Sequence, residues 1–152
     1  MKVVTVTHSL RTKEAPQFID LTDEVQAAVR KSGVTDGIVT VFSKHTTAAV
    51  RINEKESGFI EDFKEFVKKA LPPHTYYRHN DSHIRTENID CDDDRCTKNG
   101  HSHCQHMLLG TSETIPVVDG KLTLGRWQRI FLVELCSPRK REVVFQIIGE
   151  ET

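Results

Sequence analysis

The sequence lacks several features that would point directly to a function. Its 21 basic and 22 acidic residues nearly cancel, leaving a formal net charge of -1, so it has no basic excess of the kind that a general nucleic-acid binder carries. No apolar run approaches the roughly 20 residues that cross a membrane, and residues 1–10 alternate apolar and polar side chains instead of forming the apolar centre of a signal peptide. We therefore expect a cytoplasmic protein that binds neither nucleic acid nor membrane.

Cysteine is also scarce, with four residues in a chain of 152. In the cytoplasm such residues are more often thiols or metal ligands than disulfides. The chain has no pair of cysteines at the two-residue spacing of a zinc finger, so a structural zinc site built from cysteine alone is not expected.

The length and the apolar pattern predict one α+β domain over residues 1–152. The chain is long enough to build a core without metal or disulfide support. A helix is predicted between Thr22 as N-cap and Gly33 as C-cap, a second after Ser57, and a third after Asn99. β-Rich or alternating runs predict strands over 3–10, 18–20, 37–43, 47–53, 112–118, 122–124, 127–135 and 143–149. We expect a mostly antiparallel sheet with two to three helices, its later strands joined as hairpins, the first through a type I′ turn at residues 119–120.

Histidine is the unusual residue. Five of the eight histidines lie between Tyr77 and Met107, and imidazole is the side chain that most often binds metals or moves protons near neutral pH. Residues 74–99 form a polar stretch too long for a simple connection, which is typical of a functional or a disordered loop.

Two short runs could bind an anion. His45 lies between two predicted strands, with Ser43 and Thr46 beside it to orient the imidazole or to hold an anion; the alternative is a polar turn. In residues 76–81, Arg78 could grip a phosphate or carboxylate through its forked guanidinium, with His79 and Asn80 beside it; the alternative is a solvated loop.

The segment from Cys91 to His106 holds three cysteines and three histidines. Thiolates and imidazoles together favour zinc or a similar metal, although no zinc-finger spacing is present. A helix here would place His103 and His106 on one face and would point Cys104 elsewhere. Residues 92–94, three aspartates, are more typical of a solvated charge run. Trp127, beside a glycine, marks a strand edge, a bulge or an interface anchor.

Taken together, these residues resemble the YjbQ family, also called the UPF0047 family, over nearly the whole chain. The matching runs are Phe42-Ser43-Lys44-His45-Thr46-Thr47-Ala48-Ala49, Ile52-Asn53-Glu54, Tyr77-Arg78-His79-Asn80, Gly100-His101-Ser102-His103, Leu109-Gly110-Thr111-Ser112, Ile115-Pro116-Val117, Asp119-Gly120 and Gly125-Arg126-Trp127-Gln128. Residues 85–99 depart from the shorter members as a probable insertion.

The resemblance implies a compact α+β fold, a homotrimer, and the label of a secondary thiamine-phosphate synthase, which releases diphosphate as it joins two phosphorylated precursors. It also implies that His45, His79 and His103 form a catalytic cluster or bind a divalent metal such as zinc. Cys96, Cys104 and His106 are secondary candidates as metal ligands. Ser43, Thr46, Arg78, Asn80 and Trp127 are the expected substrate-binding residues, and a small phosphorylated or anionic metabolite is the expected ligand.

Three interpretations of the histidines remain. They serve an enzyme, either through a metal or as acid–base groups. They belong to a non-catalytic trimeric protein that binds a metal or another ligand. Or they are polar packing at a trimer interface. The sequence does not identify the substrate, the metal or the role of the Cys91–Cys96 insertion.

Overall fold

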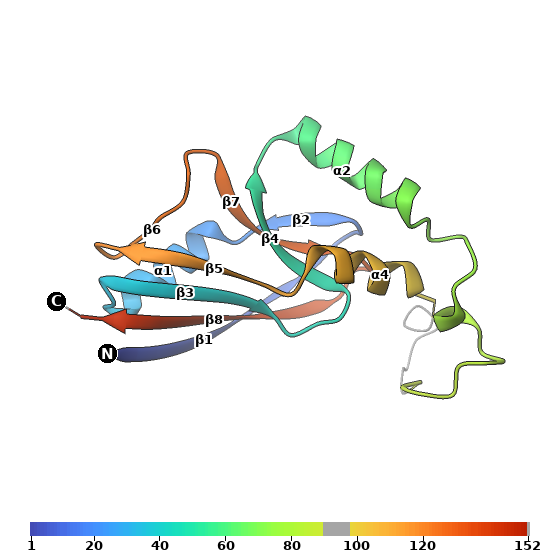
Figure 1. The fold of residues 1–152 in the computed structure, drawn as a ribbon, viewed down its shortest axis with the longest axis horizontal. Helices are drawn as coiled ribbons and strands as arrows, with labels where there is room; N and C mark the ends of the chain where they lie inside the picture. The colour runs from blue at the N-terminus through green and yellow to red at the C-terminus, as the bar shows by residue number, and fades with distance from the viewer. Residues whose placement is uncertain (90–97, 152) are drawn as a thin grey trace.

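The computed structural model describes residues 1–89 and 98–151, and the predictions that fall on residues 90–97 lie outside this part. The described chain forms strands and helices in an α+β order (Figure 1). These are β1 (Lys2–Arg11), β2 (Gln17–Asp20), α1 (Thr22–Ser32), β3 (Asp36–Ser43), β4 (Ala48–Glu54), α2 (Ser57–Ala70), the 3-10 turn η1 (Arg78–Asn80), α4 (Gly100–Leu109), β5 (Ser112–Val118), β6 (Lys121–Leu122), β7 (Gln128–Glu134) and β8 (Lys140–Glu150).

The strands form two sheets, and all their pairings are antiparallel. One sheet has the order β1-β8-β3-β5-β6 and the other the order β2-β7-β4. The predicted α+β class and antiparallel pairing are therefore confirmed. The expectation of hairpins between the later strands is wrong beyond β5–β6, because β7 and β8 enter different sheets. β7 is apolar on both faces, which suits the central strand of a sheet covered on both sides.

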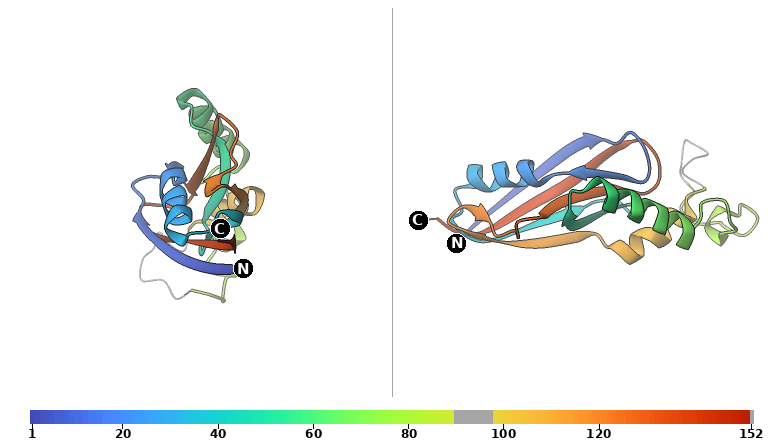
Figure 2. Two further views of the ribbon diagram at one scale, coloured as in Figure 1. Left: turned by 90° about the vertical axis from the view of Figure 1, so that its left-hand side faces the viewer. Right: turned by 90° about the horizontal axis from the view of Figure 1, so that it is seen from above.

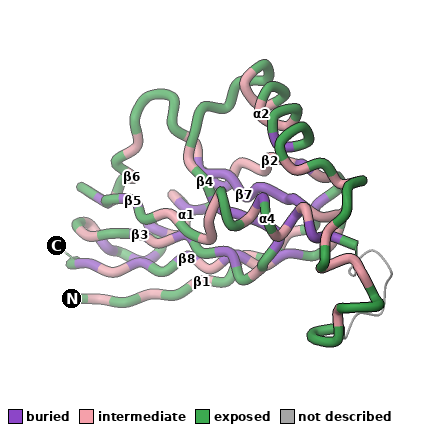
Figure 3. Tube along the Cα trace, turned by 45° about the vertical axis from the view of Figure 1, so that its right-hand side comes forward, coloured by how far each residue is buried: buried purple, intermediate pink, exposed green. Residues whose placement is uncertain are grey.

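The main core lies between the two sheets and α1. It includes Val25 and Val29 of α1, Leu132 of β7 and Phe145 of β8. A second cluster on the other face of β7, built around Phe131 and Val133, packs against Phe18 and the end of α4. Phe63 of α2 reaches Phe18 with 5.8 Å between ring centroids. β7 is consequently buried along most of its length (Figure 3).

The ends of the elements agree with the predictions in part. Gly33 closes α1 with φ of 77°, and residues 119 and 120 both have positive φ, 50° and 69°, as the type I′ turn requires. Thr22 is not an N-cap: its hydroxyl donates to Asp20 Oδ1 instead. Glu56, not Ser57, caps α2, with its carboxylate accepting from two backbone N–H groups.

The molecule is elongated, and its ends differ in character (Figures 1 and 2). Both termini lie at one end of the five-stranded sheet. The polar segment with η1 and the start of α4 lie at the opposite end, beside the β3–β4 turn and the β7–β8 turn. None of the helices in the described ranges is long and apolar enough to cross a membrane. Segments distant in sequence thus meet at one polar end.

Candidate functional site

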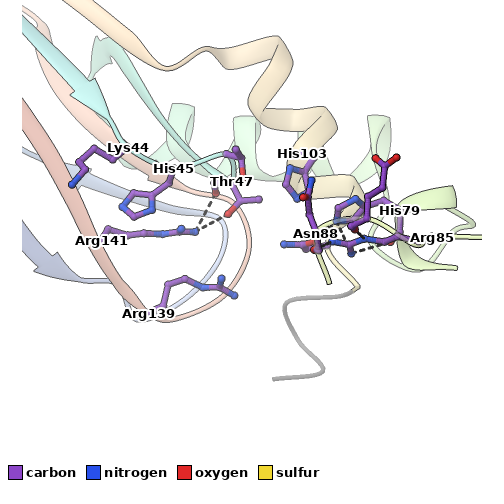
Figure 4. A pocket seen from close by; sticks show the side chains of 12 residues that line it. Lys44, His45, Thr47, His79, Arg85, Asn88, His103, Arg139 and Arg141 are labelled. Carbon is purple, nitrogen blue, oxygen red and sulfur yellow. Dashed lines mark hydrogen bonds between the residues drawn. The ribbon is translucent and has the colours of Figure 1, made fainter. Parts of the chain in front are cut away.

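A cavity of about 590 Å³ opens at this polar end, a size typical of small-molecule sites. Four segments surround it: the β3–β4 turn, the loop after η1, the start of α4, and the β7–β8 turn (Figure 4). The described lining residues are Lys44, His45, Thr46, Thr47, His79, Arg85, Glu87, Asn88, Asn99, His103, Arg139 and Arg141. All three histidines that the sequence singles out line this one cavity.

A buried ion pair fixes one wall. Arg141 of β8 donates to both carboxylate oxygens of Glu134 in β7, at 2.7 and 2.6 Å, and to Thr47 Oγ1 at 2.9 Å. Thr12 also donates to Glu134, which has no exposed surface. Burial alone would raise the pKa of Glu134, but hydrogen bonds and charge from Arg141 hold it below its ordinary value. The pair therefore joins both sheets beneath the cavity.

His45 is held as a neutral hydrogen-bond donor. Its Nε2 accepts the backbone N–H of Glu142 at 2.8 Å, so the proton of the neutral ring resides on Nδ1. Burial lowers the pKa of His45, and the charge of Arg141 lowers it further. Near pH 7 the neutral His45 ring can therefore donate a hydrogen bond through Nδ1–H.

His79 and His103 form a close pair, with ring centroids 4.4 Å apart. His79 Nε2 lies 3.0 Å from Asn99 Oδ1. The Asn99 amide nitrogen donates to Cys136 Sγ, so Oδ1 faces His79 Nε2 as an acceptor, whereas Arg85 Nη1, 3.2 Å from the same Nε2, can only donate. Burial lowers the pKa of His103 to about 4, with further contributions from the repulsion that a protonated His79 would exert and from the charge of Arg85. The pKa of His79 is also lowered, mainly by burial and by Arg85. Both rings are therefore neutral near pH 7.

Positive charge dominates the cavity. Arg85 lies within 3.2 Å of the His79 ring and is held by the carbonyl oxygens of His79, Glu87 and Asn88. Arg139 donates to Cys136 Sγ and Ser137 Oγ. Lys44 pairs with Glu142 at 2.7 Å but stays about half exposed. Among the described lining residues Glu87 is the one carboxylate against four cationic side chains, of which Arg141 and Lys44 are already paired with Glu134 and Glu142 behind the lining. The cavity is thus suited to an anion.

The predicted substrate-binding residues divide into three groups. Thr46 lines the cavity. Ser43 and Asn80 support its walls: the Ser43 hydroxyl donates to Ala48 O at 2.6 Å, and Asn80 Oδ1 accepts the Gly100 N–H at 2.9 Å. Arg78 is exposed on η1, and Trp127 is 62% exposed in the β6–β7 connection, far from η1 (Figure 1). Neither of these two lines the cavity, and their predicted roles remain predictions.

The described residues do not fit a three-histidine metal site. Within residues 1–89 and 98–151, no three His, Cys, Asp or Glu side chains gather as a metal-binding group. His45 Nε2 and His79 Nε2 are already engaged, by a backbone N–H and by Asn99. Of the secondary candidates, Cys104 is exposed and His106 lies 3.4 Å from Thr111 Oγ1, while Cys96 lies outside the described residues. The zinc site stays a prediction.

Sequence reasoning missed most of the cationic wall. Arg85 falls where the insertion was expected to begin, and Arg139 and Arg141 fall in the connection between two strands. Asn99 occupies the N-cap position of α4 as predicted, but its side chain makes no capping hydrogen bond and contacts His79 and Cys136 instead. A signal was present, since residues 139–141 are a run of three basic residues. Nothing local linked that run to the histidines.

The fold and the site define an α+β protein with a cationic, histidine-lined cavity, and comparison with known proteins assigns its family. The model of the UPF0047 protein YjbQ-like family matches residues 6–150. A UPF0047 protein of Methanothermobacter thermautotrophicus is 37% identical over 150 residues, covering 99% of this chain and 95% of the relative. A UPF0047 protein of Archaeoglobus fulgidus is 38% identical over 140 residues, covering 92% of this chain and 98% of the relative. The chain belongs to the YjbQ/UPF0047 family.

Solved structures agree with this assignment. A hypothetical protein from Aeropyrum pernix K1 superposes with a TM-score of 0.83 at 35% identity, covering 97% of this chain and 99% of that chain. A protein described as an uncharacterized conserved YjbQ/UPF0047 family member from Clostridium acetobutylicum gives 0.81 at 36% identity, covering 94% and 99%. The resemblance stated from the sequence is therefore confirmed, together with the fold.

Proposed function

We propose that the chain is an enzyme that binds a small phosphorylated metabolite in the histidine-lined cavity and transfers or cleaves it. The observation that carries this proposal is the meeting of four cationic side chains with three histidines in one cavity. Phosphate oxygens accept the charge-assisted hydrogen bonds that arginine and lysine donate. His45 adds a neutral Nδ1–H donor beside them.

The His79–His103 pair supplies the proton chemistry in this proposal. Cationic neighbours and burial hold both rings neutral. A bound phosphate group would offset the charge of Arg85 and would therefore favour protonation of the pair. A protonated imidazole next to the phosphate can then deliver its proton to a departing oxygen. In this proposal Asn99 Oδ1 accepts the Nε2–H of His79, and Arg85 Nη1 donates to His79 O instead of to the ring.

The specific reaction that we propose is diphosphate-releasing transfer, as in thiamine-phosphate synthesis. Arginine and lysine side chains would stabilise the charge that develops on the leaving diphosphate. The test supplies hydroxymethylpyrimidine diphosphate with thiazole phosphate and measures diphosphate release. We expect His79→Gln and His103→Gln to lower kcat by about 100-fold or more. His8→Gln is the matched control, since His8 lies on β1, outside this cavity, and stacks on Phe145.

Turnover that survived both cavity variants would contradict the proposed proton transfer. Binding of phosphate compounds without any turnover would favour the alternative, a non-catalytic ligand-binding protein. This alternative draws support from the three lining arginines, which are all already held by hydrogen bonds in a preformed cavity.

We also propose that the chain forms a homotrimer. The outer face of the five-stranded sheet supports self-association, because Val3, Ile148, Ile38 and Pro116 form one row across four strands. Ile38 is 41% exposed and Phe42, on the same face, 44%, and exposed apolar patches commonly mark interfaces. Light scattering should give three times the mass of the chain, and Ile38→Lys should reduce it. A monomeric wild-type protein would contradict the trimer.

A further inference from the structure

A second cavity, of about 230 Å³, lies where the end of α2, the middle of α4 and the chain before β2 meet. Pro16, Pro73 and Leu135 give it apolar walls, and His101 and Gln105 of α4 line it together. None of these residues lines the first cavity. Its volume is below the roughly 300–1,000 Å³ of pockets for drug-sized ligands, so it suits a single-ring compound.

Gln105 leaves a buried acceptor without a donor. The side chain is 3% exposed, and its Nε2 donates toward Val67 O at 3.4 Å and Leu71 O at 3.3 Å, at the end of α2. Both neighbours are carbonyl oxygens, so the nitrogen must face them, which fixes the orientation of the amide. Gln105 Oε1 is buried and receives no hydrogen bond from any described residue.

His101 leaves a second such acceptor. The Ser102 hydroxyl donates to Leu135 O at 2.6 Å, so its oxygen can only accept from His101 Nε2, 3.2 Å away. His101 Nε2 therefore carries the proton and Nδ1 has a lone pair. Nδ1 is buried, again without a partner in the part of the chain that the structure describes. Burial lowers the pKa of His101, with a further contribution from His74, which keeps the ring neutral.

The two acceptors act together because residues four apart share one face of a helix. A buried acceptor that lacks a donor is costly, and here the two side chains that carry such acceptors line the same small cavity. We propose that this cavity binds a small uncharged compound carrying an –NH2 group, such as a primary amide, a urea or an amino-substituted heteroaromatic ring, whose N–H bonds are received by Gln105 Oε1 and His101 Nδ1. Lys68 also lines the cavity and disfavours a cationic amine.

The second cavity shares a partner with the first. Cys136 lines the second cavity, and its sulfur accepts hydrogen bonds from Asn99 and Arg139, which line the first. An occupant of the second cavity would therefore contact Cys136. Cys136 is hydrogen-bonded to Asn99, and Asn99 contacts His79 in the first cavity. The proposed site is a separate one, however, and it does not depend on the reaction proposed for the first cavity.

The test uses the full chain labelled with 15N, with benzamide as the probe and N,N-dimethylbenzamide as its matched partner that lacks N–H donors. We expect benzamide to shift the Gln105 side-chain and His101 ring signals saturably, with a Kd on the order of millimolar for so small a ligand. The dimethyl compound should bind at least about tenfold more weakly, as expected when buried acceptors lose their donors. Equal binding of the two compounds, or no binding of benzamide, would overturn the proposal.

Variants of α4 residues show which side chains bind benzamide. Gln105→Leu and His101→Phe remove one acceptor each, and each should weaken benzamide binding about tenfold. Cys104→Ser, on the same helix but exposed, should leave it unchanged. If Gln105→Leu does not fold, the comparison of the two probes on the wild-type chain still decides. A long-lived water that contacts both acceptors and is not displaced by benzamide would overturn the proposal.

Discussion

The rings of His79 and His103 lie with their centroids 4.4 Å apart, although 23 residues separate them in the chain. Two contacts bring them together: Asn80 Oδ1 accepts the first N–H of α4, from Gly100, and Asn99 Oδ1 lies 3.0 Å from His79 Nε2. Residues that precede position 90 and follow position 97 thus meet at the start of α4. This junction sets the geometry of the candidate site.

Asn99 should control the protonation of His79. Replacing it by alanine removes the acceptor that favours the Nε2–H form, so Asn99→Ala should lower the pKa of His79 further. Asn99→Asp places a negative charge beside His79 and should raise the pKa of His79. The measurement is the pH titration of the His79 ring by NMR. Asn53→Ala, on an exposed residue of β4, is the control and should change nothing. Shifts of the same sign in both Asn99 variants would refute this role.

Stability should fall as the pH is lowered from about 6.5 to about 4. The ordinary pKa of histidine is 6.5 and that of His103 in the fold is about 4, so between these values the unfolded chain binds a proton that the folded chain does not. Below about pH 4 this contribution levels off. Since the ring is partly exposed, we expect a loss on the order of 1–2 kcal/mol from His103.

Denaturation by urea across this pH range measures the effect. His103→Gln should reduce the slope of unfolding free energy against pH. Part of the slope should remain in this variant, because the pKa values of His79, His101 and His106 are also lowered. An unchanged slope in the variant would show that His103 titrates normally in the folded chain.

Gly100→Ala should loosen the junction between η1 and α4. An added Cβ would lie 2.6 Å from Tyr77 Cβ and 3.2 Å from Asn80 Oδ1, so the two segments must separate. We expect a loss of about 1–3 kcal/mol of unfolding free energy, as for other overpacked positions. Gly125→Ala is the control, since its Cβ would meet the exposed Gln128 side chain at 3.3 Å and should change stability by less than about 0.5 kcal/mol. Equal effects would argue against this close contact.

Breaking the Glu134–Arg141 pair should be among the most damaging changes near the site. Glu134→Gln or Arg141→Met leaves one buried charge without its partner, and each should cost about 3–5 kcal/mol of unfolding free energy. The double variant Glu134→Leu/Arg141→Met removes both charges and should cost less than the sum of the single changes. Strict additivity in urea denaturation would mean that the two residues act independently.

The sequence predicted most elements of the fold, because alternation along the strands and apolar stripes on the helices are local signals. The positions of β3, β5 and α4 follow from such patterns. The split into two sheets did not follow, because the sheet that β7 or β8 joins depends on packing between distant strands. Similarly, Ser57 is of the residue type that N-cap positions prefer, and only the backbone geometry selects Glu56 instead.

The candidate site was predicted for its histidines and missed for its charges. The family resemblance picked out His45, His79 and His103, whereas composition alone gave eight histidines. Arg85 and Arg141 carry no local mark, since surface arginines are common and only the fold brings them to the cavity. Arg78 had the better local context, beside His79, but the 3-10 turn leaves it exposed outside the cavity.

Calorimetric titration of the chain with diphosphate measures whether the cavity holds a phosphate group through its cationic wall. Arg85→Gln should weaken binding about 10- to 100-fold, since a charge-assisted hydrogen bond contributes about 1.5–3 kcal/mol. Arg85→Lys, which keeps the charge, should lose less. Arg78→Gln removes the same group seven residues earlier, outside the cavity, and should bind like the wild-type chain. Equal losses in Arg78→Gln and Arg85→Gln, or no binding by the wild-type chain, would contradict the account.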